Sequence, residues 1–386
     1  MCGRTPAAVV GEAPTTGRAG EKLAFGDVPL SELQAFHRLC RIRPYHLVML
    51  RLLPRPTFGP LSARRSRALG RRAAPAAMAV LGSGSAAGWR LGEPLNGRGY
   101  ASVFPVRHGP DSAALLKATD TVLGRAELQR EVDTLAALHA DERLDGWADL
   151  LPRTLATGDV GDVHFVLETC LPGSDVRTLP VGTERDRMVN RALDAIVELQ
   201  SRTATVRPIG DDEIERWVRG PAVHVRAALP RKMRSVLDRV EDELVGALHH
   251  RQVARGWVHG DFNAANVLVD GGRVSGIVDW DTADPDSPVV IDAAMLLLWP
   301  NDARGPELGQ QVLHRLASPG VLADVVPDVQ RRHGGEEIDV RTALLLVWLR
   351  HVGANLAENV RYAANPVWMH RNVRTVLLGL DRRDRR

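Results

Sequence analysis

The stretch from residue 257 to residue 281 narrows the folds open to this chain more than any other part of the sequence. A short apolar segment precedes the polar run His259–Asn266, which reads His-Gly-Asp-Phe-Asn-Ala-Ala-Asn. Two β-prone runs follow, Val267–Val269 and Val274–Val278, separated by the turn-forming residues Asp270–Gly272. This order predicts a polar loop that leads directly into a two-stranded hairpin.

Three polar side chains come together if that hairpin forms. Asp261 and Asn266 lie five positions apart in the loop, and Asp279 follows the returning strand. We therefore expect Asp261 and Asp279 at neighbouring strand ends. Transfer of a γ-phosphoryl group needs a carboxylate that accepts the proton of a hydroxyl, together with an amide and a second carboxylate that hold Mg²⁺. Asp261 fits the first role, and Asn266 with Asp279 fits the second.

These residues give the chain a resemblance to a known family. The order His-Gly-Asp, four residues, Asn and later Val-Asp resembles the aminoglycoside phosphotransferase and choline kinase branch of the protein-kinase-like superfamily, over roughly residues 90 to 380. The resemblance implies an α+β, bilobal protein-kinase-like fold, with a small β-rich lobe over the nucleotide and a larger helical lobe. It also implies that His259 and Asp292 brace the catalytic loop.

Length and composition divide the chain into parts. At 386 residues it exceeds the usual size of a single hydrophobic core. We expect a disordered N-terminus over residues 1–25, an N-terminal extension of unknown role over 26–90, the small lobe over 91–172, and the helical lobe with the catalytic loop over 173–386. The extension either enlarges the small lobe or docks on it. Its Ser62–Leu81 stretch is expected to form an arginine- and alanine-rich helix interrupted at Pro75.

Lysine is rare here, with three residues among 50 basic ones. Lys117 lies in the apolar run Ala113–Ala118, where an unpaired ammonium group is costly to bury. Downstream, apolar residues recur at helical spacing over residues 128–138, and Glu131 lies beside that stripe. We expect Lys117 to pair with Glu131 and to bind phosphate, with Glu127 as the second choice of partner. A surface lysine on an edge strand is the alternative.

Two further small-lobe segments are expected to contact the nucleotide. Asn96–Val106 has the pattern of a glycine-rich loop between two strands, with serine in place of a third glycine. Val163–Gly173 reads as an apolar strand ended by Pro-Gly, and by the resemblance it bonds the adenine edge. The expected nucleotide-binding residues are Gly97, Gly99, Ser102, Lys117, Glu131 and Glu168.

The large lobe reads as mainly helical. Apolar stripes predict helices near residues 189–200 and 233–244, and Arg341–Ala363 reads as one long, largely buried helix. Candidate pocket residues in this lobe fit two alternatives, an acceptor pocket or a tryptophan core with solvated glutamates. They are Trp299, Glu336, Glu337, Trp348, Glu358 and Trp368.

Acidic residues crowd the segment after Asp279. Asp281 is two positions on, so an extended strand would point both side chains to one face. Asp281 is therefore a candidate for binding the acceptor or a second Mg²⁺. Asp284 and Asp286 fit either the same role or a turn formed with the neighbouring prolines.

Charge and cysteine content exclude several classes of protein. The net charge of +3 is mild, no apolar run approaches the length of a membrane span, and three scattered cysteines suit neither a disulfide framework nor a zinc site. We expect a cytoplasmic protein without a membrane span. Eight arginines and no acidic residue lie between Arg51 and Arg90. We favour a solvated face for this run over a nucleic-acid site, and expect no nucleic-acid partner.

The expected function is ATP-dependent O-phosphotransfer from Mg·ATP to a hydroxyl of a natural product, sugar or amino alcohol. ATP, or GTP in its place, and Mg²⁺ are the expected cofactors, while the acceptor and the oligomeric state stay open. The alternative is a nucleotide-binding pseudokinase or scaffold whose N-terminal extension binds a partner. Protein kinase activity is disfavoured because His-Gly-Asp replaces His-Arg-Asp, and neither Asp-Phe-Gly nor Ala-Pro-Glu occurs.

Overall fold

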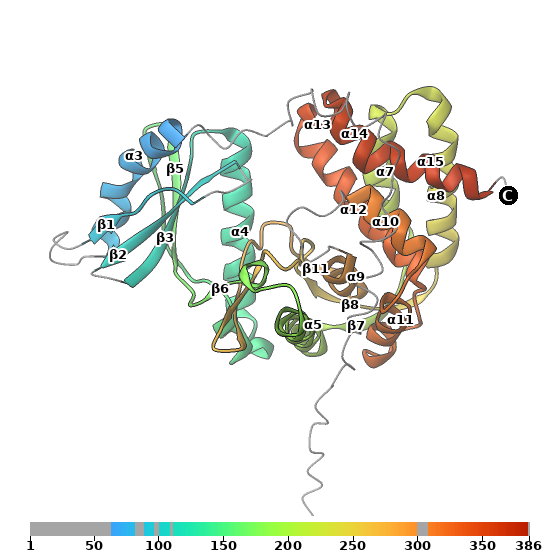
Figure 1. Ribbon diagram of the computed structural model, residues 1–386, viewed down its shortest axis with the longest axis horizontal. Helices are drawn as coiled ribbons and strands as arrows, with labels where there is room; N and C mark the ends of the chain where they lie inside the picture. The colour runs from blue at the N-terminus through green and yellow to red at the C-terminus, as the bar shows by residue number, and fades with distance from the viewer. Residues whose placement is uncertain (1–62, 82–88, 96–99, 109–110, 299–307, 385–386) are drawn as a thin grey trace, which may run out of the picture.

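The protein forms a sheet-based lobe and a larger helical lobe (Figure 1), which confirms the predicted bilobal α+β fold. The computed structural model describes residues 63–81, 89–95, 100–108, 111–298 and 308–384. Predictions for residues 1–62, for Gly97 and Gly99, and for Trp299 lie outside the described residues. The small lobe consists of α3 (Ala63–Leu81), β1 (Trp89–Leu91), β2 (Ser102–His108), β3 (Asp111–Thr119), α4 (Val122–Ala140), β4 (Thr154–Val160) and β5 (Val163–Thr169).

The small-lobe sheet is antiparallel, with strand order β1-β2-β3-β5-β4. Side chains alternate between its two faces along each strand. One face buries Phe104, Leu116 and Phe165 against α3, and these residues form the small-lobe core. Lys117 is out of phase with Leu116, so it lies on the other face of the sheet.

Helix α3 runs unbroken through Pro75, so the predicted interruption is wrong. The buried side of the helix is rich in small residues, Ala73, Ala74 and Ala77, which let it pack closely on the sheet. Pro75 is on the exposed side. Proline removes one intrahelical hydrogen bond, but on a solvent-facing side water can bond to the freed carbonyl group. Packing against the sheet therefore keeps the helix continuous.

The large lobe begins after β5. It contains β6 (Ser174–Asp175), α5 (Thr183–Thr203), β7 (Thr205–Pro208), α6 (Asp211–Ile214), α7 (Gly220–Ala228), α8 (Arg231–Leu248), β8 (Gln252–Val258), β9 (Val267–Asp270), β10 (Arg273–Ile277), β11 (Asp284–Pro288), α9 (Val290–Leu298), α10 (Leu308–Ala317), α11 (Leu322–Arg332), α12 (Val340–Glu358), α13 (Val360–Ala364), α14 (Pro366–Met369) and α15 (Thr375–Asp384). The described residues also contain five short helical segments: η1 (Glu142–Leu144), η2 (Trp147–Leu150), η3 (Val176–Thr178), η4 (Glu215–Arg219) and η5 (His370–Arg374).

The predicted hairpin is present. Strands β9 and β10 pair antiparallel, with β6 beside β9 in a three-stranded sheet. Gly271 and Gly272 form the turn with φ of 55° and 74°, the left-handed pair that a tight two-residue hairpin requires. A second three-stranded sheet, β11-β8-β7, places the end of β8 directly before the loop His259–Asn266.

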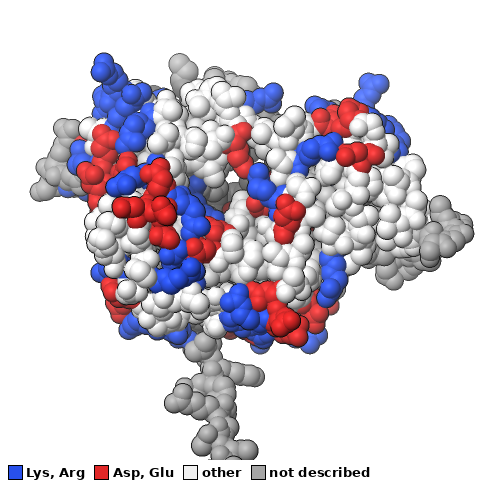
Figure 2. All heavy atoms as spheres, turned by 180° about the vertical axis from the view of Figure 1, so that it is seen from behind, with Lys and Arg blue, Asp and Glu red and all other residues white. Residues whose placement is uncertain are grey.

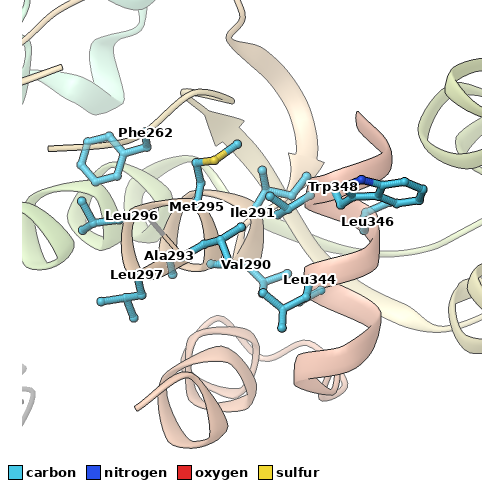
Figure 3. Close-up of a cluster of buried hydrophobic side chains, with 14 of the residues drawn as sticks. Phe262, Val290, Ile291, Ala293, Met295, Leu296, Leu297, Leu344, Leu346 and Trp348 are labelled. Atoms are coloured by element: carbon cyan, nitrogen blue, oxygen red, sulfur yellow. The ribbon is translucent and has the colours of Figure 1, made fainter. Parts of the chain in front are cut away.

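The large-lobe core is built around α9 and α12 (Figure 3). Phe262 anchors the polar loop in this core, together with Met295 and Leu296 of α9. Trp348 of α12 is fully buried there and donates a hydrogen bond to Asn372 O at 2.7 Å. Of the two alternatives for this tryptophan, the core position is therefore correct.

The predicted long helix over residues 341–363 is two helices. Asn359 breaks it, with φ of −144° and ψ of 112°. The Asn359 side chain accepts a hydrogen bond from Arg361 N at 2.9 Å and so caps the start of α13. Asparagine competes for backbone hydrogen bonds in this way at helix ends, which explains the break.

Helix α4 lies between the two lobes in Figure 1. Its Leu135 and Leu138 pack in the large-lobe core, while Glu131 in its middle is buried beneath the small-lobe sheet. No helix in the described ranges is both long and apolar enough to cross a membrane.

Candidate active site

The loop His259–Asn266 is braced by Asp292, in the first turn of α9. One carboxylate oxygen of Asp292 accepts a hydrogen bond from His259 N at 2.8 Å, and the other accepts one from Gly260 N at 2.9 Å. The His259 ring is fully buried, and its Nε2 lies 2.9 Å from Val278 O. Burial lowers the pKa of His259 and raises that of Asp292. Both residues occupy the bracing positions that the resemblance implies.

Gly260 gives the loop its sharp bend. Its φ is +83°, a left-handed conformation that glycine adopts without steric cost. A Cβ atom added there would lie 2.4 Å from Thr282 O. Only glycine therefore fits between His259 and Asp261.

Asp261 and Asn266 meet as predicted. Asn266 Nδ2 donates a hydrogen bond to Asp261 O at 3.0 Å and lies 3.5 Å from Asp261 Oδ2. Val278 N donates to Asn266 O at 2.9 Å, which brings the residue preceding Asp279 against the loop. Burial, together with the charge of Asp279, raises the pKa of Asp261 to about 7. The polar loop and the hairpin thus bring the three predicted side chains to one place.

Asp279 does not lie in an extended strand, so that part of the prediction is wrong. Strand β10 ends at Ile277, and Asp279 has a left-handed φ of 71°. The neighbouring Trp280 is fully buried, with its ring 6.1 Å from that of Trp147 and 4.5 Å from that of His259. Burial of this large side chain fixes the turn, and the turn sets the position of Asp279.

Asp281 lies near Asp279 even though the strand is absent. Burial, followed by the charges of Asp279 and Glu127, raises the pKa of Asp281 to about 9. Arg130 of α4 is 3.7 Å from its carboxylate. Burial, followed by Asp279, likewise raises the pKa of Glu127 to about 7. Negative charge therefore exceeds positive charge in this part of the structure.

Lys117 is buried between two carboxylates. Its Nζ atom lies 2.5 Å from Glu131 Oε2 and 3.1 Å from Glu168 Oε2. Burial acts to lower the pKa of Lys117, but Glu131, Glu168 and Asp279 outweigh it and raise that pKa. The predicted partner Glu131 is present, and the second choice, Glu127, instead accepts a hydrogen bond from Tyr100 N at 3.3 Å. Lys117 is thus fixed in direction and close to Asp279.

Glu168 was expected in the nucleotide-binding set as part of the strand that ends in Pro-Gly. Its side chain is only 2% exposed and faces Lys117 because β5 pairs directly with β3. Burial raises the pKa of Glu168 to about 7, although Lys117 counteracts this. The contact makes Glu168 a second partner of Lys117, a role that needs the strand order of the folded sheet.

The hydroxyl of Ser102, a residue expected in the nucleotide-binding set, does not face Lys117. Ser102 alternates in phase with Phe104 on the α3 side of the sheet, and it lies 2.9 Å from the hydroxyl of Ser66 in α3. Its side chain therefore points away from the face that carries Lys117. Any contact of Ser102 with a nucleotide is left to its backbone.

Contacts between the lobes were missed by sequence reasoning. Arg130 of α4 binds Glu358 of α12 at 2.8 Å, and Asn359 Nδ2 lies 2.5 Å from the Tyr100 hydroxyl. These pairs are separated by 228 and 259 positions, so no local pattern connects them. Glu358, proposed for an acceptor pocket, is thus partly used in an ion pair with the small lobe.

The other acidic candidates have partners within the large lobe. Asp284 and Asp286 lie in strand β11 rather than in a turn. Arg207, Arg216 and Arg255 surround Asp286, while Asp284 accepts a hydrogen bond from Ser287. Glu336 pairs with Arg251, and Glu337 pairs with Arg331. The structure thus gives each of these four residues a partner other than Asp261, Asn266 or Asp279.

The donor atoms at Asn266 and Asp279 suit Mg²⁺. That ion takes oxygen ligands and usually binds only one or two protein carboxylates, with phosphates and water completing its shell. Within the described residues no group of three or more His, Cys, Asp or Glu could hold a metal alone. The raised pKa values of Asp261, Asp279 and Asp281 reveal an excess of negative charge that a divalent cation would relieve.

On the face opposite to that of Figure 1, basic and acidic side chains are interleaved over the surface (Figure 2). Exposed arginines of α3 form ion pairs with acidic side chains of the small lobe. Arg65 pairs with Asp120, Arg67 with Glu93, and Arg72 with Asp162. The arginines of this run that lie in α3 thus form a solvated, salt-bridged helix face.

The chain resembles known proteins in both sequence and fold. A family model described as "Phosphotransferase enzyme family" matches residues 93–325. Aminoglycoside phosphotransferase APH(4)-Ia is 16% identical with a TM-score of 0.50, over 75% of this chain and 93% of that one. A thermostable mutant of APH(4)-Ia, in ternary complex with AMP-PNP and hygromycin B, is 15% identical with a TM-score of 0.51, over 78% and 97%. No curated protein matches the chain.

Proposed function

This chain belongs to the phosphotransferase enzyme family, and from that premise we propose that it transfers the γ-phosphoryl group of Mg·ATP to a hydroxyl of a natural product, sugar or amino alcohol. The observation that carries the proposal is the meeting of Asp261, Asn266 and Asp279 at the braced loop. These residues supply the proton acceptor and the two magnesium ligands that phosphoryl transfer uses.

The nucleotide side of the site is assigned to five residues. When bound, Mg·ATP supplies the phosphoryl group and neutralises much of the surrounding negative charge. Lys117 binds phosphate oxygens, and Glu131 with Glu168 holds its ammonium group in place. Asn266 and Asp279 hold the magnesium ion.

The acceptor side is assigned to Asp261. Its carboxylate accepts a hydrogen bond from the acceptor hydroxyl and takes the proton late in the reaction. By then the new oxygen–phosphorus bond is forming and the bond between the γ-phosphorus and the leaving ADP is breaking. Positioning of the hydroxyl supplies most of the rate enhancement. The brace from Asp292 to His259 N and Gly260 N fixes the backbone that carries Asp261.

The first test needs no acceptor. Calorimetry should detect binding of ATP or GTP that depends on Mg²⁺, and Asp279→Ala should abolish that dependence. Asp270→Ala, an exposed carboxylate at the hairpin turn, is the matched control and should bind like the wild type. A wild-type protein that binds neither nucleotide would overturn the proposal and favour the scaffold alternative.

The catalytic assignment has its own test. Once a screen of aminoglycosides, macrolides, sugars and amino alcohols yields an acceptor, Asp261→Asn should lower turnover by roughly 10²- to 10⁴-fold, as expected for loss of a general base. Nucleotide affinity should change little, because the amide keeps the shape of the side chain. A variant that retains most of its turnover would show that Asp261 is not the base.

A further inference from the structure

Helix α3 lies outside the family match, which begins at residue 93, yet it is an integral part of the small lobe. Its buried side covers the face of the sheet opposite to Lys117. The contact is close: a Cβ atom added to Gly70 would lie 2.8 Å from the ring of Phe104. Because the packing is this tight, a shift of α3 would also shift the strands beneath it.

Among the polar contacts made by the first two turns of α3, one reaches the start of β2 and one reaches the segment that precedes α4. Ser66 bonds to Ser102 at 2.9 Å, and both side chains are buried, at 7% and 5% exposure. Arg65 Nη2 lies 2.8 and 2.9 Å from the two carboxylate oxygens of Asp120. The buried bond is the more costly to lose, because a buried hydroxyl left without a partner keeps its full desolvation penalty.

The two partners of α3 lie at the starts of β2, which pairs with the strand that carries Lys117, and of α4. Ser102 is the first residue of β2 and follows the glycine-containing segment. Asp120 directly precedes Thr121, the N-cap of α4, whose side chain accepts a hydrogen bond from Gly124 N. Helix α4 carries Glu131, the partner of Lys117.

A further contact joins these two points. Thr119, which precedes Asp120, donates a hydrogen bond from its hydroxyl to Tyr100 O at 2.9 Å. Ser102 is also directly opposite Ala118 in the strand register. The start of β2 and the start of α4 thus form one connected unit, and α3 holds it at two positions.

We propose that Arg65 and Ser66 are positioning residues for nucleotide binding, which act through Asp120 and Ser102 and touch no substrate themselves. The inference rests on the proposed function, since it assumes a nucleotide on the Lys117 face. It assigns the described part of the N-terminal extension a role in setting where the start of β2 and the start of α4 lie relative to each other.

The test compares two arginines of the same helix. Arg65→Ala removes the ion pair beside α4, whereas Arg72→Ala removes the ion pair of a similarly exposed arginine to Asp162, at the turn between β4 and β5. Arg65→Ala should weaken Mg·ATP binding by at least about fivefold, the lower end of typical coupling between sites. Arg72→Ala should bind Mg·ATP like the wild type, and both variants should have similar melting temperatures without nucleotide.

Ser66→Ala extends the test to the buried contact, and Ser66→Thr restores a hydroxyl. The first should weaken Mg·ATP binding and the second should recover most of it. Equal nucleotide affinity in Arg65→Ala, Arg72→Ala and wild type would overturn this inference alone. Failure of the wild type to bind Mg·ATP would overturn the proposed function as well, so the two failures are distinguishable.

Discussion

Asp279 combines an unfavourable backbone with an unfavourable charge. It is one of two described non-glycine residues with a positive φ, and a left-handed conformation costs a residue other than glycine roughly 1 kcal/mol or more. Burial and the charge of Glu131 also raise its pKa. A residue held at such a cost in free energy is typical of a functional site, where the surrounding structure holds a strained residue in place.

Replacing Asp279 should therefore stabilise the protein while removing metal binding. Asp279→Asn keeps a side chain that tolerates the left-handed backbone but removes the buried negative charge. Its free energy of unfolding in urea, measured at neutral pH without Mg²⁺, should rise by roughly 1 kcal/mol. Asp270→Asn at the exposed turn is the control and should leave stability unchanged. A less stable Asp279→Asn variant would contradict this account of the site.

Among the elements, α3 shows how packing can override local preference. Its arginine-rich side is solvated, while its alanine-rich side fits against the sheet. Helix α12 shows the opposite outcome, because Asn359 ends it by capping the next helix. The difference lies in side-chain chemistry: Pro75 removes a donor and crowds the preceding turn but offers the backbone no other partner, whereas Asn359 does offer one.

Pro75→Ala should stabilise the small lobe. The exposed position leaves no cavity, and alanine restores the hydrogen bond that proline removes, a gain of up to about 3 kcal/mol. Thermal unfolding should show a higher melting temperature. Pro366→Ala is the matched control, because proline at the first position of α14 is favourable there and its loss should bring no gain. A lower melting temperature for Pro75→Ala would mean that the proline ring itself makes stabilising contacts.

At the scale of the whole molecule, the described residues form two separate hydrophobic cores. The small-lobe core includes α3, whereas the large-lobe core extends through α9 and α12. Helix α4 contributes to both lobes, and the Arg130–Glu358 ion pair and the Tyr100–Asn359 bond cross between them. These two contacts involve the end of α12, so this helix helps to connect the large-lobe core to the small lobe.

The overall stability should depend on pH through His351 of α12. Burial lowers the pKa of His351 from 6.5 to about 4. Between these values the unfolded chain binds a proton that the folded protein does not, so stability is full above pH 6.5 and is lost as pH falls toward 4. For this partly exposed residue the loss should be on the order of 1 kcal/mol.

The check for His351 is the difference between wild type and His351→Gln in urea unfolding, measured at several pH values between 7.5 and 5. The stability advantage of the wild type should shrink as pH falls. His370→Gln, which changes an exposed histidine of η5, controls for the loss of an imidazole. A difference that stays constant with pH would show that His351 does not titrate in this way.

Sequence alone predicted the parts of the site that are close in the chain. The loop His259–Asn266 and the hairpin are contiguous, so the meeting of Asp261 with Asn266 follows from local pattern. The Lys117–Glu131 pair could also be predicted, because a strand and the helix after it bring both residues together. The contact of Glu168 with Lys117 could not be predicted, since it requires that β5, and not β4, pairs with β3.

Other features depend on the folded surroundings. The left-handed backbone of Asp279 follows from the burial of Trp280 between Trp147 and His259, which the run Val-Asp-Trp-Asp does not reveal. The side of the sheet that Ser102 faces depends on α3, which lies outside the recognised pattern. In each case long-range packing, rather than local propensity, decides the position.

Lys117 is buried and ion-paired in a chain that contains only three lysines. Isotopic labelling of lysine alone would therefore give a magnetic resonance spectrum with few side-chain signals. An ammonium group shielded from water exchanges its protons slowly, so the Lys117 signal should stand apart from that of the exposed Lys232. The protein thus contains a nearly unique spectroscopic probe at the centre of its proposed phosphate site, without any engineered substitution.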